Sequence, residues 1–145
     1  MSVLMSKDYG KIEYHNEDIL AFPDGIFGFS ELKSFIPLAL EDQGDSSILL
    51  LLAKENPSIA FAVIDPFMLD PNYAPSLLPE ELAYMGVSSE DKLSFYAICV
   101  LRDNYKDNTV NLKCPIVINP ENRTGMQVIL SDSNYKYSHK LSEFV

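Results

Sequence analysis

The chain has 145 residues, a length typical of one domain (residues 1–145) that buries roughly 70% of the surface of its unfolded form. Apolar residues make up 47% of the chain and charged residues 22%, which argues against global disorder. The formal net charge is −10. Because phosphate binding needs clusters of Lys and Arg, nucleic acid is a poor direct ligand.

The negative charge is concentrated in the first part of the chain. Residues 1–90 contain four Lys and fifteen Asp or Glu, a net charge of −11. Residues 91–145 contain seven Lys or Arg and six Asp or Glu, a net charge of +1. An acidic surface favours encounter with basic proteins, and it also aids solubility whatever the partner. Composition alone leaves both interpretations open.

Short apolar runs separated by turn residues predict a chain built mainly of β-strands. The first five predicted strands are residues 9–14, 17–22, 34–40, 48–53 and 59–64. The acidic segment 41–45 is a predicted turn between the third strand and the fourth. Because residues 48–52 are apolar without interruption, their strand is expected to be covered on both faces, as in a closed barrel.

Residues 23–25, Pro-Asp-Gly, predict a turn that leads into a segment rich in glycine and aromatic residues. Neither a Lys-Ser or Lys-Thr pair nor a helix N-terminus follows these glycines, so the segment is not a phosphate-binding loop. Its apolar side chains are expected to plug one end of the core. They are Ile26, Phe27 and Phe29.

The strand 59–64 ends at residues 65–66, Asp-Pro, and the segment 67–79 is predicted to be an irregular surface loop. Four of its side chains are unusually apolar for a loop: Phe67, Met68, Leu69 and Tyr73. With Asp65 and Asp70 beside them, they have the composition of an interface, apolar anchors with a polar rim. The alternative is that the apolar side chains fold back onto the barrel mouth.

A short helix is predicted at residues 79–85, with proline and two acids in its first turn and Gly86 as its stop. The later predicted strands are residues 92–102, 109–112, 116–118 and 128–130. The last two form a hairpin, and the polar tail 131–145 predicts no single element.

The hairpin turn, residues 119–125, is longer than the tight two-residue kind. Pro115 is expected at the start of its strand or on an edge, because it cannot donate to a ladder, and Gly125 permits a positive φ. Arg123 at the tip is a candidate clamp for an anion or a carboxylate, with a solvated turn residue as the alternative. Asn119 and Arg123 are the candidate partner-binding residues of this turn.

Eight or nine short strands, one helix and no strand–helix alternation predict a mostly β fold. The expected architecture is a small antiparallel β-barrel-like domain with one short helix. Closure of the sheet would remove the exposed edges that so many apolar strands would otherwise leave.

No catalytic or metal-binding motif is present, so we expect no enzyme, no metal and no cofactor. Two Cys and two His at unrelated positions do not make a zinc site, and Cys99 and Cys114 lie in or beside apolar runs typical of a core. Asp65, at a strand end before a proline, is either a catalytic base or the cap of a turn.

The N-terminus lacks an apolar segment of signal-peptide length, and the longest uninterrupted apolar run is residues 48–53. We therefore expect a cytoplasmic protein without a membrane partner.

Three stretches of the chain stand out together: residues 22–29 (FPDGIFGF), residues 61–67 (FAVIDPF) followed by residues 71–73 (PNY), and residues 111–130 (NLKCPIVINPENRTGMQVIL). They resemble the FliW family, the bacterial flagellar assembly factors. The stretches occur in the same order as in the family. The resemblance implies a small β-barrel-like fold and a non-enzymatic function.

The resemblance also implies partners. Members of this family bind the C-terminal region of flagellin in the cytoplasm, and they bind CsrA, an RNA-binding translational repressor, relieving its repression of flagellin synthesis. Flagellin secretion then frees the factor to sequester CsrA. The alternatives are an acidic chaperone that shields flagellin without a regulatory partner, and an enzyme built on scattered carboxylates. The candidate partner-binding residues are Asp65, Phe67, Asp70, Tyr73, Asn119 and Arg123.

Overall fold

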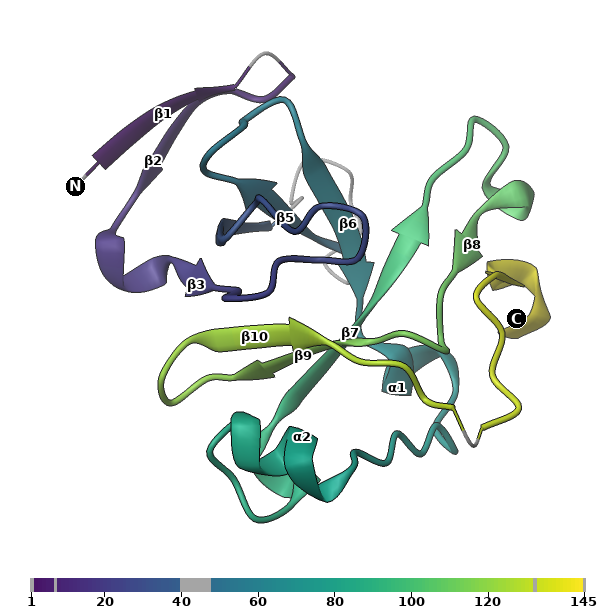
Figure 1. Ribbon diagram of the computed structural model, residues 1–145. Helices are drawn as coiled ribbons and strands as arrows, with labels where there is room; N and C mark the ends of the chain where they lie inside the picture. The colour runs from purple at the N-terminus through teal and green to yellow at the C-terminus, as the bar shows by residue number, and fades with distance from the viewer. Residues whose placement is uncertain (1, 7, 40–47, 132, 145) are drawn as a thin grey trace.

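The computed structural model describes residues 2–6, 8–39, 48–131 and 133–144, and most of its strands belong to one curved sheet (Figure 1). The described strands are β1 Ser2–Ser6, β2 Gly10–Tyr14, β3 Leu20–Ala21, β4 Ser34–Ala39, β5 Ile48–Ala53, β6 Ala60–Ile64, β7 Ser94–Val100, β8 Thr109–Val110, β9 Ile116–Asn119, β10 Thr124–Gln127 and β11 His139–Lys140. The α-helices are α1 Pro66–Leu69 and α2 Pro79–Tyr84. Single turns of 3-10 helix lie at Asn16–Asp18, Glu90–Lys92, Tyr105–Asp107 and Leu141–Phe144.

Seven strands close into a barrel in the order β7-β6-β5-β4-β3-β10-β9, and β9 returns to pair with β7. Neighbours in the barrel are antiparallel except β3 and β10, which are parallel. β8 and β11 continue the sheet beside the C-terminal end of β7, and β1 and β2 form a separate hairpin. The predicted mostly β, barrel-like fold is confirmed. Two details differ, because one strand pair is parallel and a second short helix, α1, is present.

The alternation of side chains explains why both faces of the barrel wall are apolar. In β7, Phe95 and Ala97 face outward into one cluster, whereas Tyr96 faces the barrel interior. In β5, Leu51 faces the interior and Leu52 faces outward, and each is 0% exposed. This confirms that the uninterrupted apolar run of β5 is covered on both faces.

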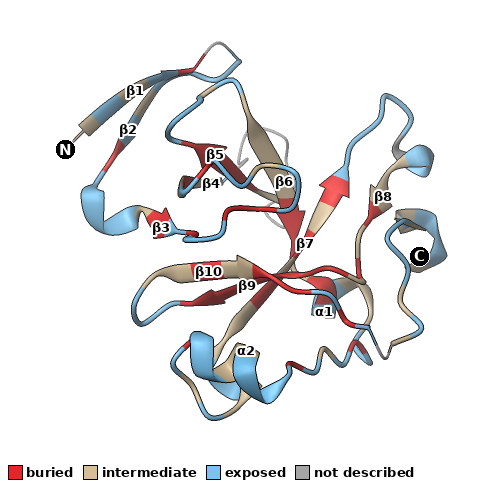
Figure 2. Ribbon diagram, viewed as in Figure 1, coloured by how far each residue is buried: buried red, intermediate tan, exposed pale blue. Residues whose placement is uncertain are grey.

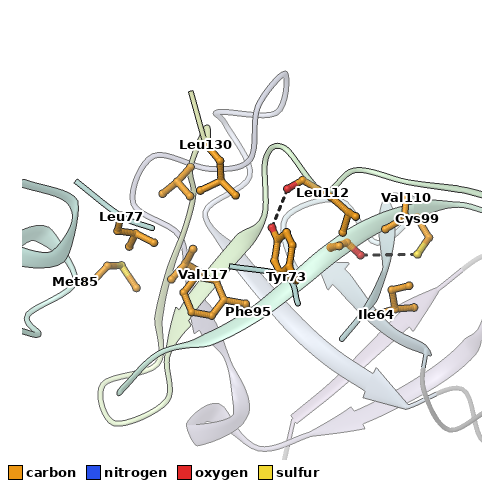
Figure 3. Packing of buried hydrophobic residues seen from close by; sticks show 12 residues of the cluster. Ile64, Tyr73, Leu77, Met85, Phe95, Cys99, Val110, Leu112, Val117 and Leu130 are labelled. Atoms are coloured by element: carbon orange, nitrogen blue, oxygen red, sulfur yellow. Dashed lines mark hydrogen bonds between the residues drawn. The ribbon is translucent and has the colours of Figure 1, made fainter. Parts of the chain in front are cut away.

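Three hydrophobic clusters fill and cover the barrel. Figure 2 shows buried residues on most strands of the barrel wall. The interior cluster comprises Leu20, Phe22, Ile26, Leu32, Phe35, Leu51, Ala53, Val63, Ile116 and Ile118. An outer cluster lies beneath the segment from α1 to α2 and the C-terminal tail, and comprises Ile64, Tyr73, Leu77, Met85, Phe95, Ala97, Cys99, Val110, Leu112, Val117, Val128 and Leu130 (Figure 3). A smaller outer cluster under the β1–β2 hairpin contains Tyr14, Ile36 and Leu52.

The segment after Pro23 plugs one end of the barrel, as predicted for two of its three apolar side chains. Ile26 is buried, and the Phe29 ring packs edge-to-face on Phe61 at 5.1 Å. Phe27 is 51% exposed, so its predicted burial was wrong. Its backbone N–H donates to Gln127 Oε1 at 2.9 Å, which fixes the turn while the ring stays outside.

The predicted hairpin is present, but its second strand was placed wrongly. β10 is Thr124–Gln127, not residues 128–130, and Val128 and Leu130 contribute to the outer cluster. The positive φ in the turn belongs to Arg123, at 58°, and not to Gly125. Gly125 is needed for a different reason, because a Cβ there would overlap the ring of Phe22.

Other predicted boundaries shift. Residues 17–22 were predicted as one strand, but a 3-10 turn occupies Asn16–Asp18 and only Leu20–Ala21 pairs as β3. β1 and α1 were not predicted. The predicted acidic turn at 41–45 lies outside the described residues. Among the residues that are described, no helix combines the length and apolar character needed to cross a membrane.

Candidate functional site

The helix α1 begins with a side-chain cap from Asp65. The Asp65 carboxylate accepts a hydrogen bond from the N–H of Phe67 at 2.9 Å, and Pro66 occupies the first helical position, where no N–H is needed. The N–H of Asp70 donates to the Pro66 carbonyl at 3.0 Å and ends the turn. Of the two predicted roles for Asp65, the geometry supports the cap.

Asp70 turns the chain back toward the barrel. Its carboxylate accepts from the N–H of Asn72 at 2.9 Å, and its carbonyl accepts from the N–H of Tyr73, also at 2.9 Å. These bonds form a tight turn that directs Tyr73 inward, so the Asp70 carboxylate is engaged by its own backbone.

Tyr73 was predicted to be an exposed anchor, and this was wrong: its side chain is 4% exposed. The hydroxyl donates to the Leu112 carbonyl at 2.8 Å (Figure 3). The ring of Tyr73 lies 4.7 Å from that of Tyr135. Burial, reinforced by Tyr135 and Cys114, raises the pKa of Tyr73 well above its ordinary value. Tyr73 therefore folds back onto the protein, but into the outer cluster and not onto the barrel mouth that the alternative named.

Phe67 lies at the surface, and its ring packs against two aromatic rings of the protein. Its ring is 40% exposed and packs edge-to-face on Tyr73 at 5.6 Å and on Phe95 at 6.1 Å. Met68 beside it is 69% exposed. A hollow of about 250 Å³, which we call the α1 hollow, adjoins the ring. Its lining residues are Asp65, Phe67, Leu93, Ser94, Phe95 and Tyr96.

Asn119 is buried and serves to join two elements. Its Nδ2 donates to the carbonyl of Met85 at the end of α2, at 2.8 Å, and its Oδ1 accepts from the N–H of Glu121 at 3.0 Å. Both polar ends of the side chain thus make hydrogen bonds inside the protein, and the role of Asn119 in partner binding stays a prediction.

Arg123 lies half-buried at the other end of the barrel from the plug. Its N–H donates to the Asn119 carbonyl at 2.8 Å, and its carbonyl accepts from the N–H of Ala21 at 2.9 Å. Its side chain borders a hollow of about 370 Å³, which we call the barrel mouth. The residues that line the mouth are Asp18, Leu20, Pro37, Leu49, Ser94, Tyr96, Ile118, Pro120 and Arg123.

The α1 hollow and the barrel mouth adjoin, because Ser94 and Tyr96 line both. The structure therefore brings Phe67 and Arg123, from separate sequence motifs, to one end of the barrel. Sequence reasoning missed Ser94 and Tyr96. The available signal was the alternation in β7, which places these two residues on the face opposite Phe95 and at the start of the strand.

The described residues contain no group of three or more His, Cys, Asp or Glu arranged to hold a metal. Cys99 and Cys114 are both buried, and burial raises the pKa of Cys99 to about 12. Their environment is that of packed apolar side chains and not of reactive thiols.

The chain matches the family model described as "FliW protein" over residues 3–141. A flagellar assembly factor FliW of Geobacillus kaustophilus is 38% identical over 138 residues, covering 95% of this chain and 94% of the relative. One from Caldanaerobacter subterraneus is 36% identical over 97% of this chain and 93% of the relative. A crystal structure of the flagellar assembly factor FliW superposes with a TM-score of 0.88 at 37% identity, over 97% of this chain and 96% of that one. Sequence, motifs and barrel agree, and the chain belongs to the FliW family of flagellar assembly factors, a family of non-enzymatic proteins.

Proposed function

We propose that this flagellar assembly factor switches between two protein partners in the cytoplasm, the C-terminal region of flagellin and the repressor CsrA. Flagellin occupies the factor while it accumulates, and its secretion frees the factor to sequester CsrA. Flagellin synthesis is thereby coupled to flagellin secretion. The factor acts by binding alone, with no direct contact to RNA.

The main observation in favour of flagellin binding is the ring of Phe67, which is exposed and packs against two neighbouring aromatic rings. The C-terminal region of flagellin is helical and amphipathic in this family's partners, so it needs its apolar face covered outside the filament. Phe67 and Met68 offer apolar area at the surface, and the Tyr73 and Phe95 rings hold Phe67 in place before a partner arrives. A few such aromatic anchors provide most of the affinity in helix-in-groove recognition.

The CsrA half is supported by the acidic surface. Residues 1–90 have a net charge of −11, and the Asp and Glu side chains of the described part of this segment are mostly exposed. Only two of the ion pairs among the described residues fall there, Lys11–Glu13 at 3.4 Å and His15–Glu17 at 4.0 Å. Most of this negative charge is therefore not neutralised locally, and it favours encounter with a basic RNA-binding protein.

The test of the flagellin surface is Phe67→Ala, titrated by calorimetry with a flagellin C-terminal fragment. Removal of a true anchor lowers the affinity by about 2 kcal/mol, roughly thirtyfold. Phe27→Ala is the matched control, because that Phe is similarly exposed but lies at the plugged end of the barrel. Both variants are first compared with the parent for thermal stability. Parent-like affinity of Phe67→Ala would show that flagellin binds elsewhere.

The alternative, a chaperone that only shields flagellin, has no second partner. A pull-down from the source cell distinguishes the two functions, since only the partner switch also captures a small basic dimer. In the same assay, added flagellin fragment releases that dimer from the factor. Capture of flagellin alone would favour the shielding chaperone.

A further inference from the structure

We propose that the barrel mouth binds the carboxyl-terminal residue of a polypeptide, with its apolar side chain in the mouth and its carboxylate on Arg123. This site differs from the Phe67 surface, and the proposal does not depend on which partner that surface binds. Three properties of the mouth support it: its shape, the guanidinium of Arg123, which forms no ion pair with a described residue, and the hydrogen-bond acceptors among its lining residues.

The shape fits a chain end better than a segment that passes through. The mouth is about 370 Å³, within the range of small-ligand pockets, and its apolar lining includes Leu20, Leu49 and Ile118. Below it the barrel is filled, because Phe35 and Ile116 are 0% exposed. The mouth is therefore a blind hollow that suits one or two apolar groups.

Within the part of the chain that the structure describes, the guanidinium of Arg123 has no carboxylate partner. None of the ion pairs formed between described residues includes Arg123. The backbone at this position has φ of 58°, a conformation that Gly or Asn adopts at lower cost than Arg. Turn geometry alone therefore does not call for arginine here. A half-buried guanidinium beside an apolar hollow is suited to bidentate binding of a carboxylate.

Acceptors on the same rim distinguish a peptide terminus from a simple aliphatic acid. Asp18 lines the mouth, and its Oδ2 accepts from the N–H of His15 at 3.3 Å, which leaves Oδ1 for another donor. The Ser94 hydroxyl also lines the mouth. A terminal residue brings a backbone N–H that these acceptors can pair with, whereas an aliphatic acid brings no donor.

The surrounding charge restricts the sequence of the terminus. With a net charge of −10, the protein repels an acidic peptide at distances up to the Debye length, about 8 Å at physiological salt. A terminus with an apolar last residue and no nearby acids avoids this repulsion and still presents one carboxylate to Arg123. The site thus favours neutral or basic sequences that end in an apolar residue.

The experiment is a methyl chemical-shift titration of the full chain, following Leu20, Leu49 and Ile118. The probes are the peptide acetyl-Lys-Ala-Leu-Leu with a free carboxylate, the same peptide with a C-terminal amide, and hexanoate. We expect the free acid to shift the mouth methyl signals and the amide to bind about tenfold more weakly. Hexanoate should bind more weakly than the free-acid peptide.

Variants then identify the carboxylate partner. Arg123→Gln should remove the difference between acid and amide, and Arg102→Gln, at the exposed second arginine of the chain, should preserve it. Equal binding of acid and amide by the parent would overturn the proposal, and so would shifts confined to other surfaces. Hexanoate binding as well as the peptide would replace it with a site for small acids. The acid–amide comparison uses the parent protein, so a poorly folded variant does not weaken the test.

Discussion

Replacement of Gly125 by alanine tests how tightly the barrel interior is packed. A Cβ at this position would overlap Cζ of Phe22 and lie 2.7 Å from its Cε1 and 2.8 Å from its Cε2. Ordinary carbon–carbon contacts are about 3.5–4.0 Å, so the ring would have to move by about 1 Å. Phe22 is 0% exposed and its ring packs edge-to-face on Phe35 at 5.1 Å, which leaves no space for that movement.

The expected destabilisation follows from overpacking, which costs about 1–3 kcal/mol in a dense core. The entropy of unfolding is about 2.1 cal/mol/K per residue, hence about 0.3 kcal/mol/K for a chain of 145 residues. A loss of about 2 kcal/mol then lowers Tm by about 7 °C. Thermal and urea unfolding, each followed by circular dichroism, measure this loss.

A double variant identifies the cause of the loss. Phe22→Leu alone leaves a cavity and is destabilising, but combined with Gly125→Ala it removes the ring that the new Cβ would strike. The two changes should therefore be less destabilising together than the sum of the single effects, by at least about 1 kcal/mol. Strict additivity, or a parent-like Tm for Gly125→Ala, would refute the packing argument.

Three further predictions concern other parts of the molecule. Tyr73→Phe leaves the Leu112 carbonyl without its donor and should lower the free energy of unfolding in urea by about 1–2 kcal/mol, whereas Tyr137→Phe, at an exposed tyrosine, should not change it. The rate constant for association with CsrA should fall as salt rises from 0.05 to 0.15 M, about the range over which the Debye length drops toward 8 Å; a salt-independent rate in stopped-flow experiments would argue against electrostatic steering. Burial raises the pKa of Cys99 from 9.0 to about 12, so the unfolded thiol ionises first and stability is lost as pH rises above 9. The loss should be on the order of 1 kcal/mol by pH 10 in urea unfolding, and Cys99→Ala should remove its share of it.

The apolar runs in the sequence predicted the strands of the barrel wall well, because the side chains of these strands are largely buried and therefore apolar. β5 is found at the predicted residues 48–53, β4 includes every described residue of the predicted strand 34–40, and β6 begins one residue later than predicted. In β5 both faces are covered, so every side chain is apolar and the run is easily recognised. The closure of the barrel through the parallel β3–β10 pair was not predictable, because it rests on a single register pair, Thr124 with Ala21.

The hairpin shows where pattern reasoning fails. Residues 128–130 are as apolar as a strand, but β10 ends at Gln127. Val128 and Leu130 are buried in the outer cluster, and their N–H groups donate to the carbonyls of Pro115 and Lys113 beyond the end of the assigned strand. The paired strand β10 contains Gly125 and Gln127, both buried. Gln127 is satisfied there because its Nε2 donates to the Cys114 carbonyl at 3.0 Å. Such a pairing depends on a distant partner, which local hydrophobicity does not report.

The candidate site illustrates why loop residues are hard to assign from sequence. Asp65, Asp70 and Asn119 are short polar side chains at chain reversals, and each accepts a hydrogen bond from a backbone N–H two residues later. Short polar residues such as Asp and Asn indicate a turn, and the same residue types indicate the polar rim of an interface. Their part in partner binding stays a prediction, and the structure gives each of them a local role that needs no partner.

Phe67 and Arg123 differ from those three residues because the turns that contain them do not require their side chains. The Asp65 cap and Pro66 would form the same turn with another residue in place of Phe67, and the hairpin turn would tolerate Gly or Asn in place of Arg123. Both side chains nevertheless lie at one end of the barrel, on either side of Ser94 and Tyr96. The ring of Phe67 and the guanidinium of Arg123 border adjoining hollows, and they would bind one partner together or two partners in competition. Binding of the flagellin fragment and of the free-acid peptide to the same sample distinguishes these cases, because competition requires that the two sites overlap.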